Sequence, residues 1–424
     1  MKSFFLQRKN WFITLSLLCL LALSSAACGN NGSGIGSAKP TSTVRAATSP
    51  TSTPTSTARA TTSPTSPTST PSSPPTIQMG TQPCPEAVKN PAYWNPFISA
   101  PPAIRDAYIV RCGHLLGKPT LQAMVVATDI LGGGCCVYRG IFVFDKITDP
   151  KPQLLFQVGH LLKGEAQISG YSTILTAEVD LNSSLNKGKP YAALTTDLFR
   201  EFQWSKGKRT FVQVAFPGLF PDLTRYQAEK DQLLVNQGHQ PWKLDAAQTA
   251  KSFATSILKM KSSSSVSVVS GGGPHDLNAV VHVKLQLNGA GTFPPVKLTL
   301  SRLEANITGG IWEVTAVESE NFSITSPRSH ERLDSPVTST GSGVAFEGQI
   351  GVVRVLDHLY NDIGHDFAMS QNTNSGFGPG TFSTPVKYNA SFHGGSQEGI
   401  LALYHQGGAE SDFGVVMLKV LVEA

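Results

Sequence analysis

A run of about 50 residues rich in threonine, serine and proline limits where this chain can fold. It extends from Gly29 to Thr76 and repeats blocks such as Thr51-Ser52-Thr53-Pro54. Because it has few large apolar side chains it cannot bury a core, and its prolines favour extended, solvated backbone. We therefore expect a disordered tether over residues 28–80, with the folded part starting at residue 81. Two roles suit this composition equally well: a tether long enough to cross a wall layer, or an inert spacer of no particular length.

The residues before the tether have the layout of a secretory signal peptide. Lys2, Arg8 and Lys9 precede an apolar stretch from Trp11 to Ala27. That stretch is shorter than the roughly 20 apolar residues of a membrane-spanning helix, and small residues follow it. We expect residues 1–27 to be a signal peptide, which makes the folded part an exported one.

The junction Ser25-Ala26-Ala27-Cys28-Gly29 resembles the lipobox of bacterial lipoproteins. In that family a signal peptidase cuts before a cysteine that carries a diacylglycerol group. The resemblance implies lipidation at Cys28 and a protein anchored at the outer, extracellular face of the cytoplasmic membrane. Position 25 is serine where the family usually has leucine, and Ser25 with Ala27 also suits ordinary cleavage. Free secretion is therefore the alternative.

Four cysteines lie beyond the leader and the lipidation site, namely Cys84, Cys112, Cys135 and Cys136. An even set in an exported chain predicts two disulfides. A bridge between the adjacent Cys135 and Cys136 would strain the peptide between them, so we expect Cys84 and Cys112 each to pair with one of these two. A metal site or a redox-active vicinal disulfide is the alternative.

The charge distribution gives no support to nucleic-acid binding. The chain carries a net charge of +5, yet no acidic residue precedes Glu86 while six basic residues do. Subtracting these six charges leaves −1 for the folded part. The basic character thus comes from the leader and tether.

The folded part is too long for one core, and its patterns change twice. Residues 81–240 have short strand-like runs separated by glycine and proline, which predicts a disulfide-containing β-rich domain. The runs are 104–110, 121–128, 140–144, 153–158 and 211–216. We expect this domain to close with a helix that Asp222 caps and Gly238 stops.

Residues 241–322 predict a small α+β domain. Asp245 is a candidate N-cap, and apolar residues recur at helical spacing from Ala246 to Leu258. Alternating strands follow at 281–287, 296–301 and 312–316. A helix followed by half-exposed strands is similar in topology to cystatin-like and NTF2-like folds, a likeness that implies no function.

Residues 323–424 predict an all-β sandwich, with short strands at 344–346, 351–356, 381–386, 400–404 and 415–422. This part resembles the Gmad2 family, an immunoglobulin-like sandwich of exported bacterial lipoproteins, some linked to sporulation and germination. The matching residues are Ile324-Thr325-Ser326-Pro327, Ser335-Pro336-Val337, Gly341, Ala345-Phe346-Glu347-Gly348, Val352-Val353-Arg354-Val355, Gly380 and Phe382. The stretch His358–Gly378 is longer than expected for the family. The resemblance implies no catalytic residues.

The sequence lacks the common phosphate-loop, zinc-protease, nucleophile-elbow and EF-hand motifs. One cluster has donors suited to a metal ion, but it falls in a predicted loop, where solvated polar residues are ordinary. It comprises Asp357, His358, Asp362, His365 and Asp366. We expect no metal and no cofactor.

Aromatic residues cluster at Tyr93-Trp94-Asn95-Pro96-Phe97. They could stack on sugars, but we expect Trp94 and Phe97 to plug a core beside Cys84. We likewise expect Phe216–Pro221 to be a rigid linker packed on the helix after it, and the triple-glycine runs at 132 and 271 to be turns. His282 should point outward from its strand.

These patterns favour a surface module that binds or assembles with a protein or cell-wall polymer and does not catalyse. The alternative is a wall- or carbohydrate-active hydrolase with carboxylates in the first domain, among Asp129, Glu165, Glu178 and Asp180. An exposed apolar patch would favour the binding module, whereas a cleft with converging carboxylates would favour the hydrolase.

Overall fold

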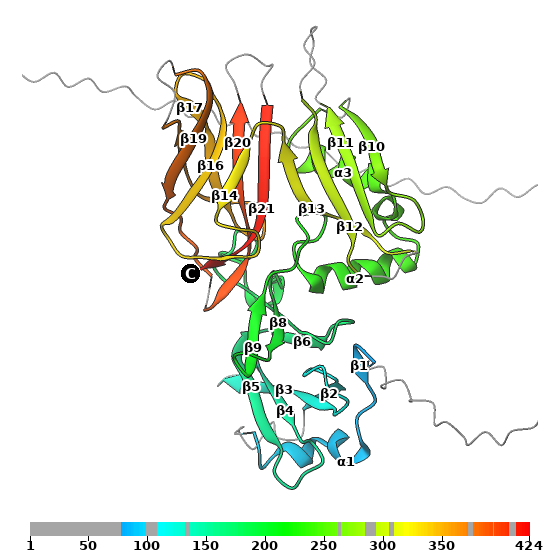
Figure 1. Ribbon diagram of the computed structural model, residues 1–424. Helices are drawn as coiled ribbons and strands as arrows, with labels where there is room; N and C mark the ends of the chain where they lie inside the picture. Colours follow the sequence, from blue (N-terminus) through cyan, green and yellow to red (C-terminus); the bar gives the residue numbers. More distant parts are fainter. Residues whose placement is uncertain are drawn as a thin grey trace, which may run out of the picture. The chain divides into compact units, whose positions relative to one another are not determined.

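The structure is a computed structural model that describes residues 78–98, 108–131, 136–261, 264–284, 294–304, 309–371, 376–392, 394–406 and 413–424. The predicted signal peptide, Cys28 and almost all of the predicted tether lie outside these residues. In the described ranges, no helix is long and apolar enough to span a membrane. Strands predominate, which confirms the expected mainly β fold (Figure 1).

Two antiparallel sheets form the first part of the fold. The five-stranded sheet has the order β1 (Thr81–Gln82), β2 (Ile109–Gly113), β3 (Gln122–Leu131), β4 (Cys136–Asp145) and β5 (Gln153–Leu162). The four-stranded sheet has the order β6 (Glu165–Ile168), β7 (Ile174–Glu178), β8 (Leu198–Ser205) and β9 (Thr210–Val214). Alternating side chains of both sheets, including Val126, Ile141, Ile174 and Phe211, meet in one core.

Short helical segments flank these sheets. They are α1 (Glu86–Lys89), η1 (Pro91–Trp94) and η3 (Tyr191–Ala193). The tryptophan that ends η1, Trp94, is fully buried, and its indole N–H donates to the carbonyl oxygen of Val88 at 2.9 Å. Phe97 packs on the same cluster, and the half-cystine Cys84 lies beside it. The prediction that these rings plug a core is confirmed.

Helix α2 (Arg225–Asn236) starts later than the sequence predicts. Its N-cap is Thr224, whose hydroxyl accepts a hydrogen bond from the backbone N–H of Gln227 at 3.3 Å. The prediction that Asp222 caps this helix is wrong, because the Asp222 carboxylate instead pairs with Lys243 at 3.1 Å. Asp222 and Thr224 are both suitable N-cap residues by sequence. The ion pair with the buried Lys243 engages Asp222, and Thr224 caps the helix. The helix stops before Gly238, as predicted.

Helix α3 (Ala246–Ser256) follows η4 (Pro241–Leu244). The Asp245 side chain accepts a hydrogen bond from the backbone N–H of Gln248 at 2.9 Å, which confirms the predicted N-cap. Apolar residues of this helix, Phe253 among them, pack on the strands that come next in the chain. Phe216 packs against Ala228 and Val235 of α2, so the linker Phe216–Pro221 lies against its helix as expected.

The largest sheet contains nine strands and includes strands from both later predicted domains. Its path is β10 (Ser265–Gly271), β11 (Asn278–Lys284), β12 (Val296–Arg302), β13 (Trp312–Ser319), β21 (Phe413–Glu423), β20 (Ser396–Gln406), β17 (Gln349–Leu356) and β18 (Asp362–Met369). The ninth strand, β15 (Arg332–Leu333), pairs with β21 in parallel. Val317 of β13 pairs with Met417 of β21, so the sheet continues across the boundary predicted at residue 322.

The two halves of this sheet are covered on opposite faces (Figure 1). Helix α3 covers the first half, β10–β13, and its core extends to Val415 and Met417 of β21. A three-stranded sheet covers the second half on the other face, where Val416 and Val420 point. That sheet has the order β14 (Ser323–Ser326), β16 (Val337–Ala345) and β19 (Gly378–Val386). The alternation of side chains along β21 supplies both cores.

Candidate binding surface

The second half of the large sheet is open over part of the face opposite its three-stranded cover, because Leu356, Ile400 and Ala402 of that face are buried in the core under α3. Strand register places Val352, Phe367 and Tyr404 in one lateral row of this face, from β17, β18 and β20. Arg354 and His365 lie in the next row, beside Ala402. We call the outward side chains of these three strands the aromatic face: Val352, Arg354, His365, Phe367, Met369 and Tyr404.

Large apolar side chains remain exposed on this face and at the adjoining end of the strands. Phe367 and Met369 are 55% and 52% exposed, although each lies in a regular strand. At the end of the strands, the Phe346 and Phe377 rings pack edge to face with centroids 5.3 Å apart and are 43% and 54% exposed. Such a concentration of exposed apolar area on one end of a β-sandwich is characteristic of an interaction surface.

An ordered set of charges crosses the aromatic face. The Asp362 carboxylate contacts Arg354 Nη1 at 2.8 Å and His365 Nδ1 at 3.1 Å. The Arg354 guanidinium lies 5.7 Å from the centroid of the Tyr404 ring. Burial raises the pKa of Tyr404 to about 12. The positive charge of Arg354 lowers this pKa in part, and the negative charge of Asp362 raises it further. One carboxylate thus contacts both the Arg354 guanidinium and the His365 imidazole.

A groove of about 540 Å³ lies where the end of α3 meets the aromatic face. We call it the aromatic groove. Its wall at the helix end includes Ile257 and Lys259, and its other side carries Arg354, Tyr404 and Phe413. Apolar residues therefore form most of the lining, with charged groups at the rim, a composition common in ligand sites.

The first half of the sheet also has an open face, with a different chemistry. His282, Lys297 and Glu318 line a groove of about 470 Å³ between this face and β14. Lys297 and Glu318 face each other across β12 and β13 and form an ion pair at 2.8 Å. The alternating burial of β11 puts His282 on the outer face, as predicted. Gly271 ends β10, and Gly272 and Gly273 lie in the connection to β11, so the predicted turn starts one residue later than expected.

The candidate metal cluster is not supported. Its residues were expected in a loop, but Asp362–Met369 form strand β18, so His365 and Asp366 alternate between faces. Asp357 accepts hydrogen bonds from the N–H groups of Leu359 and Asn361, and His358 is buried 3.9 Å from Asp197. Only Asp362 and His365 meet. Across the described residues, no group of acidic, histidine or cysteine side chains is arranged to hold a metal ion.

The carboxylates considered for a hydrolase occupy separate environments. Glu165 lines a groove of about 280 Å³ with Arg111 and accepts a hydrogen bond from the Tyr226 hydroxyl at 2.6 Å. Glu178 is buried and pairs with Arg200. Asp180 is buried, and burial raises its pKa. The side chain of Asp129 lies outside the described part. Of the three that are described, only Glu165 lines one of the grooves identified above.

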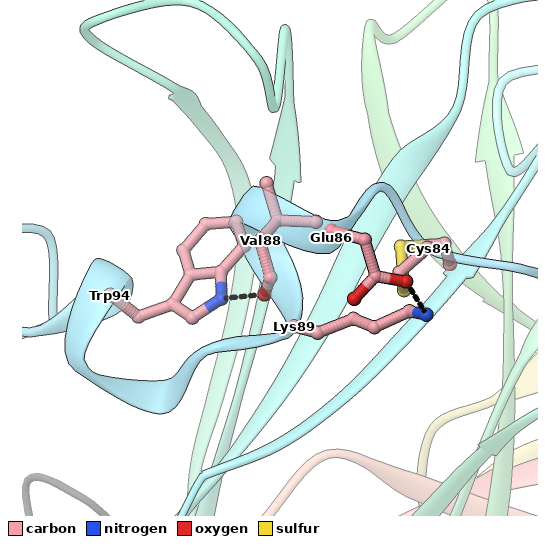
Figure 2. Close-up of a disulfide and its surroundings, with 6 residues drawn as sticks. Cys84, Glu86, Val88, Lys89 and Trp94 are labelled. Carbon is pink, nitrogen blue, oxygen red and sulfur yellow. Dashed lines mark hydrogen bonds and ion pairs between the residues drawn. A yellow bond between two sulfur atoms is a disulfide. The ribbon is translucent and has the colours of Figure 1, made fainter.

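The cysteine pairing differs from the expectation. Cys84 is bonded to Cys112, with their Cα atoms 5.2 Å apart, so neither can bridge to the adjacent cysteines (Figure 2). The reason is the pairing of two strands: β1 places Gln82 opposite Cys112 on β2, which brings Cys84 within bonding distance. Cys135 and the side chain of Cys136 lie outside the described residues.

Buried charges hold the Phe216–Leu223 linker on the large sheet. The Glu398 carboxylate accepts a hydrogen bond from the N–H of Phe216 at 2.9 Å, and Lys419 Nζ donates to the carbonyl oxygens of Gly218 and Leu223. Glu398 and Lys419 lie 3.4 Å apart and are fully buried. Burial raises the pKa of Glu398 to about 7 against the attraction of Lys419. It also lowers the pKa of Lys419.

Sequence reasoning missed the aromatic face because it placed the segment from Asp357 to Asp366 in a loop between strands. The alternation Phe367-Ala368-Met369 was the available signal, since Ala368 is buried while its two neighbours point outward. Arg354 was noted only within the family motif, and Tyr404 only as part of a strand. Register with β18 was needed to bring them together.

Comparison with known proteins finds no relative. No family model matches the chain, and no curated protein or solved structure is significantly similar to it.

Proposed function

We propose that this protein is a non-catalytic binding or assembly module of the cell surface, with a surface protein or cell-wall polymer as its partner. The observation that carries the proposal is the exposed apolar surface formed by Phe346, Phe367, Met369 and Phe377. Exposing such area to water is unfavourable by about 25 cal/mol per Å², so a partner that covers it gains free energy. In this proposal the C-terminal part is a Gmad2-like sandwich.

Placement at the cell surface rests on the N-terminal sequence. A lipid on Cys28 would hold the chain at the outer face of the membrane, with the tether between lipid and folded part. The Cys84–Cys112 disulfide suits an oxidising compartment of this kind. Palmitate labelling of the full chain tests the anchor: we expect incorporation that Cys28→Ser abolishes. Equal labelling of that variant would contradict it.

Capture experiments with the full chain test the binding role. Immobilised wild type is compared with the double variant Phe346→Ser, Phe367→Ser on fractionated surface proteins and wall polymers. We expect the double variant to retain less than a tenth of the captured component. The matched control is Val269→Ser, Leu277→Ser, which removes two apolar side chains of similar exposure from the β10–β11 hairpin. Equal losses in both double variants would contradict the proposal.

A further inference from the structure

The aromatic groove has two partly buried rings that face its opening. Tyr404 lies on β20 and Phe413 on the neighbouring strand β21, and both pack on the α3 core from one side. Behind them, the Tyr360 hydroxyl donates to the carbonyl oxygen of Leu219 at 2.6 Å and fixes a third ring in the wall. Rings held in this way offer rigid faces on which the C–H groups of a sugar ring can pack.

The rim of the groove carries two cationic side chains, Arg354 and Lys259, and one carboxylate, Asp362, which leaves an excess of positive charge. Among the described residues, Arg354 uses one guanidinium nitrogen for its ion pair with Asp362, which leaves donors that can reach a ligand. Lys259 also lines the groove, and no described residue forms an ion pair with it. The chain has Lys251, Lys259 and Lys261 but no acidic residue between Asp245 and Asp276. The helix end of the groove is therefore basic.

The groove is open along the sheet. Its lining residues Arg354 and Tyr404 belong to the same lateral rows as His365 and Phe367, so the surface continues across β17 to β18. An open surface with repeated ring and charge positions suits an extended polymer better than a compact ligand. A neutral apolar ligand would leave Arg354 and Lys259 unused, and a polyanion without rings would leave Tyr404 and Phe413 unused.

We propose that the aromatic groove binds an anionic glycan, with sugar rings on Tyr404 and Phe413 and the acidic groups at Arg354 and Lys259. This inference rests on the proposed binding function and names its ligand class. Asp362 then acts as a positioning residue, because its carboxylate orients the Arg354 guanidinium. The geometry joins stacking and charge recognition within a single groove.

Titration calorimetry of the full chain tests this with three probes: the tetramer of galacturonic acid, the neutral tetramer of galactose, and inorganic polyphosphate. We expect the acidic tetramer to bind at least tenfold more tightly than either other probe, and its affinity to fall as salt is raised. Equal binding of polyphosphate, equal binding of the neutral tetramer, or no binding of the acidic tetramer would overturn the proposal.

Substitutions locate the binding. We expect Arg354→Gln and Tyr404→Ala each to weaken binding of the acidic tetramer at least tenfold. Lys297→Gln, which removes a cation from the other open face, should leave it unchanged. Arg354→Gln alters an exposed side chain and keeps the test valid if Tyr404→Ala fails to fold. Binding that is unaffected by Arg354→Gln would overturn the assignment. If the acidic tetramer does not bind but capture still depends on Phe346 and Phe367, the glycan proposal is wrong and the proposed binding function is retained.

Discussion

The two halves of the nine-stranded sheet are built on the same plan with opposite cover. Helix α3 packs on one face of β10–β13, whereas β14, β16 and β19 pack on the other face of β17, β20 and β21. The first half leaves its outer face open and the second half leaves part of one face open, since Leu356, Ile400 and Ala402 lie in the α3 core. Each open region has a groove at the edge of the neighbouring cover. The first open face carries the Lys297–Glu318 ion pair, and the second carries Phe367, Met369 and Tyr404.

This difference shows which exposed surface the fold itself explains and which one it leaves unexplained. The first open face carries the charged groups of Lys297 and Glu318, which water hydrates, beside apolar residues such as Phe322 and Ile324 that line its groove. An apolar open face gains from being covered, and no cover for Phe367 or Met369 is found in the described chain. The architecture accounts for the first face, and a partner is the simplest account of the second.

Substitutions in the covered faces of the sheet should lower the stability of the fold the most. Phe253 of α3 packs on the first half of the sheet and Phe382 packs in the sandwich, and both are almost fully buried. We expect Phe253→Ala and Phe382→Ala each to lower the free energy of unfolding by about 3–5 kcal/mol, because each leaves a cavity. Urea denaturation measures this. If one half tolerated the loss, the two covers would not be equivalent.

The next largest effect should come from the buried Glu398, which makes the free energy of unfolding depend on pH. Its pKa of about 7 in the folded protein lies above the ordinary value of 4.5, so the folded state holds a proton that the unfolded state releases between these values. Stability should therefore fall as pH rises from 5 to 7, by about 2 kcal/mol from this group. Denaturation across that range should show a shallower slope for Glu398→Gln. An unchanged slope would contradict this role.

The ion pair on the polar open face should contribute little. Lys297 and Glu318 are both about half exposed, so water screens their attraction. A double-mutant cycle with Lys297→Ala and Glu318→Ala should give a coupling of about 0.2–1 kcal/mol that decreases with salt. A coupling well above this range would mean that the polar face also stabilises the fold.

The smallest effect on stability should come from the apolar open face. We expect Phe367→Ser with Met369→Ser to change the free energy of unfolding by less than about 0.5 kcal/mol, because more than half of each residue's surface is already exposed to water. The same variant should elute earlier from a hydrophobic-interaction column. A large loss of stability would show instead that this face is part of the core.

Several elements could be predicted from short-range patterns. The Asp245 cap, the helix after it and the strands from Leu121 to Val158 depend on neighbouring residues, and they form as expected. Errors arose where distant groups decide. Lys243 takes Asp222 away from its expected capping role, and pairing of β1 with β2 joins Cys84 to Cys112.

By itself, the sequence determined the mainly β character, the helix at Asp245 and the buried role of Trp94, because hydrophobic periodicity and capping act within a few residues. Only the tertiary structure decided that two predicted domains share one sheet and that Phe367, Tyr404 and Arg354 lie together. Strand register between β17, β18 and β20 sets those neighbours. Register depends on which strands meet in space, and no local pattern encodes that.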